Sequence, residues 1–106
     1  MQKVEFNDLS DIFEYTIWTS EKEKFWYEKA WQDYLYWQAT DKKILKKINS
    51  LIKDIDRQDG KGLGKAEMLK GDLSGLCSKR IDETHRLVYR IVNNCIEIAS
   101  CRGHYD

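Results

Sequence analysis

A stripe of isoleucine and leucine side chains in the middle of the chain sets the first limit on its fold. After Asp41 the apolar residues recur every three or four positions, as they would along one face of a helix: Ile44, Ile48, Leu51, Ile52 and Ile55. Thr40 and Asp41 come just before the stripe, and their side-chain oxygens suit a helix N-cap. The pattern therefore predicts a helix that buries this face against a core, while its lysines mostly face water.

A second helix is predicted immediately before this one. From about Glu28 the residues at helical spacing are Trp31, Tyr34, Leu35 and Gln38. Thr40 and Asp41 can end this helix as well as begin the next. The apolar run that starts at Lys24 is typical of a short strand. The first half of the domain is thus predicted to be a strand followed by a helical hairpin.

The glycine-rich segment DGKGLGK, which begins at Asp59, separates the helices from a region where apolar residues recur with a period of two. The runs SKRID, HRLVYRIV and CIEIASC are typical of strands, and Asn93 and Asn94 suit a tight hairpin turn. The glycine-rich segment lacks the GxxxxGK[ST] spacing of a phosphate-binding loop. The order of elements predicts an α+β fold, in which the two-helix hairpin packs on one face of a small, antiparallel-rich sheet of four or five strands.

Alternation along the strands assigns side chains to the two faces of the sheet. In HRLVYRIV the residues predicted to face the core are Leu87, Tyr89 and Ile91. Those predicted on the outer face are Arg86, Val88 and Arg90. In GKAEMLKG the carboxylate of Glu67 shares a face with Lys65. In SGLCSKRID the pattern leaves open whether the set with Lys79 or the set with Arg80 faces inward.

The net charge of zero conceals an uneven distribution. Residues 1–23 contain two lysines and six acidic side chains, a net charge of −4, so residues 24–106 carry +4. We therefore separate an acidic N-terminal extension of unknown role, residues 1–21, from a mildly basic domain, residues 22–106. The positive excess of the domain weakly favours a polyanionic partner such as nucleic acid.

Length and cysteine content favour one intracellular domain, and we expect no cofactor and no metal. A chain of 106 residues can bury a single core. No segment is long and apolar enough to span a membrane, and the first residues do not form a signal peptide, so we expect a soluble, cytoplasmic protein. The cysteines argue against both disulfides and a zinc site, even with His104 added, because they are odd in number and lack CxxC spacing: Cys77, Cys95 and Cys101.

Four segments, taken together and in order, resemble one protein family. They are WQDYLYWQATDKKILKKINSLIKDI, GLGKAEMLKGDLSG, SKRIDETHRLVYRI and the closing CRGHY, and the match runs from about Lys24 to Tyr105 without a gap. Their order and spacing resemble the YoeB (Txe) toxins of the RelE superfamily. The resemblance implies a RelE-like fold and an endoribonuclease toxin that cleaves mRNA in the ribosomal A site. It also implies a YefM-like antitoxin as partner and allows a homodimer.

The resemblance further assigns roles in metal-free RNA cleavage. Attack by the RNA's own 2′-hydroxyl needs a base, an acid and a cation at the phosphorane. The resemblance implies Glu67 as the base, Arg86 as the phosphate ligand and His104 as the acid. Tyr105 would stack on an RNA base. The residues implied to bind the RNA backbone are Lys65, Lys70 and Arg80.

Several positions depart from the family pattern. Prolines usually flank the base, but Ala66 and Met68 stand there in this chain, which contains no proline. Cys77 replaces a commonly aromatic residue, and Asp106 follows the tyrosine that usually ends the chain. These changes leave open how rigidly Glu67 is aimed and how active the protein is.

Other interpretations stay open at this stage. Glu67 can be an ordinary surface carboxylate paired with Lys65, and the last residues can be a loose terminus. His85 has no role in the family and is expected to be structural. The extension 1–21 can shield the active face or be passive. In place of an mRNA-cleaving toxin, the chain can be a ParE-type toxin that poisons gyrase, or a degenerate relative that only binds an antitoxin or RNA.

Overall fold

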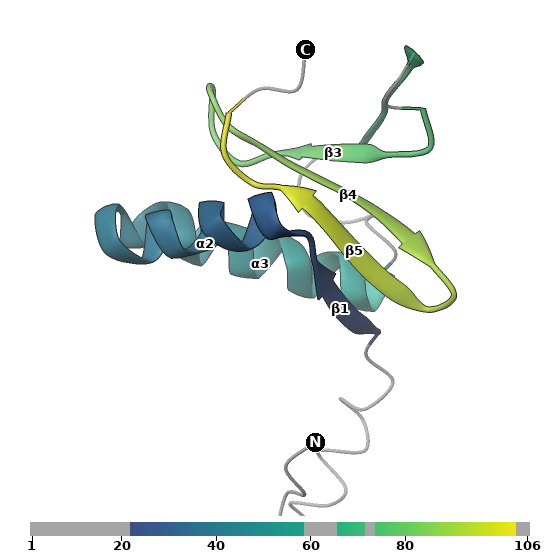
Figure 1. The fold of residues 1–106 in the computed structure, drawn as a ribbon, viewed down its shortest axis with the longest axis horizontal. Helices are drawn as coiled ribbons and strands as arrows, with labels where there is room; N and C mark the ends of the chain where they lie inside the picture. The colour runs from purple at the N-terminus through teal and green to yellow at the C-terminus, as the bar shows by residue number, and fades with distance from the viewer. Residues whose placement is uncertain (1–21, 59–65, 72–73, 104–106) are drawn as a thin grey trace, which may run out of the picture.

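The computed structural model describes residues 22–58, 66–71 and 74–103 of the chain. The elements in chain order are β1 (Glu23–Trp26), α2 (Glu28–Thr40), α3 (Lys42–Gln58), β2 (Glu67–Met68), β3 (Cys77–Arg80), β4 (Arg86–Val92) and β5 (Cys95–Ser100). The strands form one sheet in the order β1-β5-β4-β3-β2, and the helices pack on one side of it (Figure 1). The predicted α+β class, with a helical hairpin on one face of the sheet, is confirmed.

The sheet is mixed rather than fully antiparallel. β1 pairs with β5 in parallel, while the other neighbouring strands pair antiparallel. The hairpin of β4 and β5 turns at Asn93 and Asn94, whose φ values are 51° and 61°. Two successive left-handed residues are what a type I′ turn requires, and asparagine tolerates that conformation. The turn predicted at this pair is confirmed.

Asp41 ends α2 and also begins α3. Its backbone N–H donates to the carbonyl oxygen of Trp37 at 2.9 Å. Its Oδ1 accepts the backbone N–H groups of Lys43 at 3.0 Å and Ile44 at 3.2 Å. The carboxylate thereby satisfies amides of the first turn that have no partner within the helix. The predicted break between the helices is confirmed.

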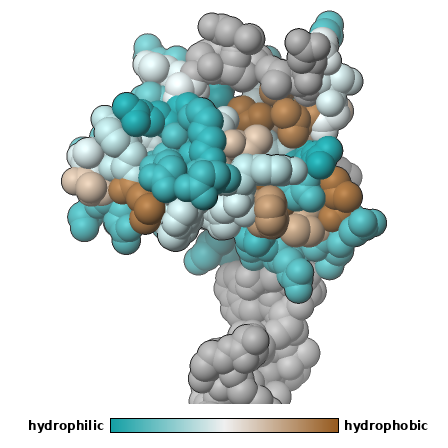
Figure 2. All heavy atoms as spheres, viewed as in Figure 1, coloured by the Kyte–Doolittle hydropathy of each residue, from teal (hydrophilic) through white to brown (hydrophobic). Residues whose placement is uncertain are grey.

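The core lies between the two helices and the inner face of the sheet. The stripe of α3 is buried at Ile48, Leu51, Ile52 and Ile55, and it packs in one cluster with side chains of β4 and β5: Leu87, Tyr89, Ile96 and Ile98. Burial of each large aliphatic side chain contributes about 1.5–3 kcal/mol. Figure 2 shows that the apolar atoms left on the viewed face of the described part are scattered in separate patches. Neither described helix is long and apolar enough to cross a membrane.

The predicted alternation along β4 agrees with the register, but two of its side chains differ in burial from what their face suggests. Ile91 is 36% exposed, although the pattern predicts it in the core. It faces the inner side, but no residue of β3 pairs with it, so this end of β4 lacks a neighbour on one flank. Val88, predicted on the outer face, is only 4% exposed because it lies in mid-sheet with a paired residue on each side: Ser78 and Ser100. Alternation therefore sets the face of each side chain, while the number of neighbouring strands sets how deeply it is buried.

Two ion pairs connect the sheet to α3. Lys79 of β3 is fully buried on the inner face, and its Nζ lies 3.1 Å from Oδ2 of Asp54. Lys24 of β1 places its Nζ 2.7 Å from Oδ2 of Asp56, which is also buried. The alternative that the β3 pattern left open is thereby resolved, because Lys79 faces inward and Arg80 outward.

Candidate active site

Three of the residues implied by the resemblance lie on the outer face of the sheet. The register places Glu67 of β2 opposite Ser78 of β3, and Arg80 of β3 opposite Arg86 of β4. Directly paired residues share a face, and so do residues two positions apart on one strand. Glu67, Arg80 and Arg86 therefore project to the same side, away from the buried Lys79.

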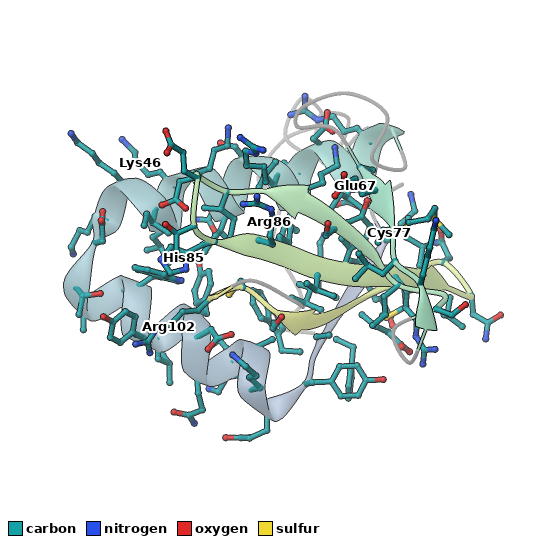
Figure 3. All side chains as sticks on the ribbon, turned by 90° about the horizontal axis from the view of Figure 1, so that it is seen from above. Lys46, Glu67, Cys77, His85, Arg86 and Arg102 are labelled. Atoms are coloured by element: carbon teal, nitrogen blue, oxygen red, sulfur yellow. The ribbon has the colours of Figure 1, made fainter. Side chains whose placement is uncertain are left out.

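Glu67 and Arg86 are separated by one intervening strand and two positions along the sheet. Regular strand spacing then puts their Cα atoms about 12 Å apart. Glu67 is exposed and Arg86 is half-buried. Both labelled side chains lie over the sheet in Figure 3, in agreement with the register. The carboxylate and the guanidinium therefore belong to one face of the sheet, with β3 between their strands.

The turn between β3 and β4 fixes the Arg86 side chain. Its Nη1 donates to the carbonyl oxygens of Asp82 at 2.8 Å and His85 at 3.1 Å. Asp82 closes the turn, because its Oδ1 accepts the N–H of Thr84 at 2.8 Å and of His85 at 2.6 Å. Partial burial acts to raise the pKa of the Asp82 carboxyl, but these two N–H donors and the nearby positive charge of Arg86 lower it below its ordinary value. The contacts use one nitrogen of a guanidinium that carries five N–H donors, so an oxyanion can still be bound.

The end of the described chain is attached to α2. The backbone N–H of Cys101 donates to Oδ2 of Asp33 at 3.0 Å, and its carbonyl oxygen accepts the Nε1–H of Trp37 at 2.9 Å. The guanidinium carbon of Arg102 lies 3.5 Å from the centre of the Tyr36 ring. Cys101 is fully buried by these contacts. Cys101 is therefore held by two hydrogen bonds to α2, and Arg102 by a cation–π contact with the same helix.

Gly103 brings this segment next to Arg86. Its carbonyl oxygen accepts the backbone N–H of Arg86 at 3.0 Å, and its own N–H donates to Nδ1 of His85 at 2.8 Å. The interpretation of the chain end as a loose terminus is thus wrong for residues 101–103. His104 and Tyr105 lie outside the described residues.

The remaining residues of the implied site fall in different places. Arg80 is exposed on the outer face, and Lys70 is exposed just after β2. Lys65 lies outside the described residues. The contact between His85 and Gly103 is absent from the predicted site, because strand alternation says nothing about a side chain in the turn before β4. The position of His85 directly before Arg86 is the only sequence signal that points to it.

The cysteines do not form a reactive or metal-binding site in the described part of the chain. All three are free thiols, and no group of three His, Cys, Asp or Glu residues within the described segments could hold a metal ion. Burial raises the pKa of the Cys77 thiol. Burial, followed by the nearby Asp33 carboxylate, raises the pKa of Cys101 to about 12. The Cys101 thiol therefore stays protonated at neutral pH and is no nucleophile.

Comparison with known sequences assigns the chain to a protein family. The sequence model of the YoeB-like toxins of bacterial type II toxin-antitoxin systems matches residues 26–105. The chain belongs to this family. Toxin YoeB of Escherichia coli K12 is 58% identical over 80 residues, which span 76% of this chain and 95% of that protein. Toxin YoeB of Streptomyces coelicolor is 53% identical over 76 residues, which span 72% of this chain and 90% of that protein.

Solved structures agree with the family assignment. The YoeB/ParE toxin from Agrobacterium tumefaciens superimposes with a TM-score of 0.76 at 44% identity, covering 78% of this chain and 99% of that one. A chain of the YoeB-YefM complex from Staphylococcus aureus gives 0.74 at 47% identity, covering 79% and 98%. YafQ from E. coli gives 0.62 at 14% identity and shares the fold alone. The RelE-like fold expected for this YoeB-like toxin is therefore confirmed.

Proposed function

We propose that this chain is a ribosome-dependent endoribonuclease that cuts mRNA in the ribosomal A site. The observation that supports the proposal is the common outer face of Glu67 and Arg86, together with the backbone contact between Arg86 and Gly103. His104 directly follows Gly103 in the chain, and Gly103 lies beside Arg86, the proposed phosphate ligand. Membership of the YoeB-like toxins is consistent with this activity.

The proposed reaction is a transfer within the RNA. The 2′-hydroxyl oxygen of one nucleotide attacks the adjacent phosphorus, so the O2′–P bond forms while the P–O5′ bond breaks. Glu67 takes the hydroxyl proton and His104 gives a proton to the departing O5′. Arg86 stabilises the charge that develops on the phosphorane. The products are a 2′,3′-cyclic phosphate and a 5′-hydroxyl, and no step requires a metal ion.

The other implied residues position the RNA. Tyr105 stacks on a base, while the backbone phosphates are bound by Lys65, Lys70 and Arg80. Glu67 is exposed in the free chain. Bound RNA can therefore reach its carboxylate directly.

Two protein partners follow from the same proposal. Structures from Staphylococcus aureus include a YoeB-YefM complex and a YoeB dimer, and their YoeB chains are 47–48% identical to this one. We propose that a YefM-like antitoxin binds and neutralises this chain in the cytoplasm, and that the free toxin can form a homodimer.

Primer extension on a defined mRNA tests the proposed activity. The intact chain should produce cuts at discrete sites when ribosomes translate the mRNA, and none when the start codon is removed, because the A site supplies the bound substrate. A DNA supercoiling assay with gyrase serves as the comparison. Inhibited gyrase without RNA cuts would favour a ParE-type toxin, and antitoxin binding without either effect would favour a degenerate relative.

We propose that residues 22–106 form the complete catalytic domain and that residues 1–21 are a passive extension. β1 begins at Glu23, the backbone N–H of Lys22 donates to Asp56, and the family match begins at residue 26. Deletion of residues 1–21 should leave the cleavage rate on translated mRNA unchanged, measured beside the full chain at equal concentration. A clear gain in rate would instead show that the acidic extension shields the active face.

A further inference from the structure

One histidine outside the implied catalytic set contacts the residue that directly precedes His104. We infer that His85 is a positioning residue, which holds Gly103 so that the end of the chain is aimed at the substrate bound by Arg86. The inference rests on the proposed function, because the direction of the chain end matters for catalysis only if the chain cleaves RNA. In Figure 3 His85 lies between Arg86 and Arg102.

His85 holds Gly103 through a single, well-defined acceptor. The N–H of Gly103 donates to Nδ1 of His85 at 2.8 Å, so Nδ1 carries no proton and the neutral ring bears its hydrogen on Nε2. The ring packs edge-on against Trp37, with 4.7 Å between ring centres and an angle of 75° between the planes. Trp37 thereby fixes the direction in which the acceptor points.

The backbone of His85 is fixed as firmly as its ring. Its N–H donates to Oδ1 of Asp82 at 2.6 Å, and its carbonyl oxygen accepts the N–H of Ile81 at 3.0 Å. The same carbonyl oxygen accepts from Arg86 Nη1 at 3.1 Å. One residue therefore contacts both the guanidinium of Arg86 and the backbone that leads to His104.

Gly103 is clamped at both of its backbone polar groups. Its N–H binds the His85 ring, and its carbonyl oxygen binds the backbone N–H of Arg86. Its φ of +89° lies in the region that other residues rarely adopt, so the chain changes direction here. With both groups engaged, the backbone of Gly103, to which His104 is bonded, is fixed relative to Arg86.

Attachment of the chain end to the domain does not depend on this contact. Cys101 is already held by Asp33 and Trp37, and Arg102 by Tyr36. The His85 bond adds only a constraint on the last residue before His104. Its loss should therefore disturb alignment in the reaction more than it disturbs folding.

Two substitutions of His85 separate these effects. Asparagine keeps an acceptor oxygen on the same Cγ position as Nδ1, while leucine fills similar space without one. His85→Leu should lower kcat on translated mRNA by about 10- to 100-fold with little change in KM, because a small misplacement of a catalytic group costs this much. His85→Asn should recover most of that loss. Both variants lose the ring contact with Trp37, so a difference in kcat between them reports the acceptor and not that contact.

Backbone amide exchange of Gly103, followed by NMR, gives a readout that does not need activity. The Gly103 N–H should exchange faster in His85→Leu than in the unchanged chain, and His85→Asn should restore its protection. Equal exchange in all three, or equal kcat for the leucine variant and an unchanged chain that cleaves, would overturn the inference while leaving the proposed function intact. If the unchanged chain fails to cleave mRNA, the proposed function has failed, and the catalytic purpose of His85 falls with it.

Discussion

Replacement of Arg86 with alanine should lower the rate of mRNA cleavage on the ribosome by about 10³-fold or more. The guanidinium carries a permanent positive charge and is anchored at the β3–β4 turn through its bonds to the carbonyl oxygens of Asp82 and His85. Its removal takes away both the charge that stabilises the phosphorane and the geometry of its donors. Single-turnover primer extension with saturating toxin measures the loss in the chemical step.

A matched control for this substitution lies on the same strand and face. Arg90 is also on the outer side of β4, but it is engaged by Glu97, with 2.6 Å between Nε and Oε1. Arg90→Ala removes an equal charge and should leave the rate nearly unchanged. Arg86→Lys should recover only part of the activity, because an ammonium cannot offer paired donors. Similar rates for the two alanine variants would contradict the role of Arg86.

The proposed base and acid can be tested in the same assay. Glu67→Gln and His104→Ala should each lower the rate by about 10²- to 10⁴-fold, as expected for loss of a general base or acid. The losses should not add in the double variant, because the groups act on one transition state. A fully active Glu67→Gln variant would return this residue to the role of an ordinary surface carboxylate.

Replacement of Asp54 with alanine should destabilise the fold by about 3–5 kcal/mol, because it leaves the buried ammonium of Lys79 without its aspartate partner. The Lys79 side chain is 0% exposed, and that of Asp54 is 11% exposed. The pair is therefore largely shielded from water. The midpoint and slope of urea unfolding, followed by tryptophan fluorescence, measure the change.

Two further variants isolate the buried charge as the cause. The double variant Asp54→Leu with Lys79→Met removes both charges and should recover most of the lost stability. Arg90→Ala breaks a more exposed pair and should cost far less stability than Asp54→Ala. A loss in the double variant as large as that in Asp54→Ala would show that packing, and not the uncompensated charge, sets the effect.

Local signals explain why much of the fold was predictable. Asp41 caps α3 by accepting N–H groups from residues only two and three positions later. Asn93 and Asn94 form a turn whose positive φ angles asparagine tolerates. The inward position of Lys79 could not be predicted, since its partner lies 25 residues earlier on another element. The parallel pairing of β1 with β5 and the exposure of Ile91 likewise depend on how strands align across the whole sheet.

The candidate site was likewise predictable only in part from local sequence. Alternation along β4 placed Arg86 on the outer face, and the register agrees. No local pattern could show that Glu67 shares this face, because β2 is separated from the helices by residues 59–65 and only its pairing with β3 determines its side. Only the family resemblance joined Glu67 and Arg86 in one predicted site. The clamp at Gly103 joins the turn before β4 to the chain end, and no short-range signal reports such a contact.

The shortness of β2 has a consequence for how the two halves of the site respond to disturbance. β2 forms the margin of the sheet and is held by two residue pairs with β3, by the bond from Leu69 N–H to the Leu76 carbonyl at 2.9 Å, and by the buried Leu69 side chain. β4 runs through the interior of the sheet, between β3 and β5. Local opening costs least at such margins, so the strand that carries Glu67 can detach and return while the platform under Arg86 stays intact.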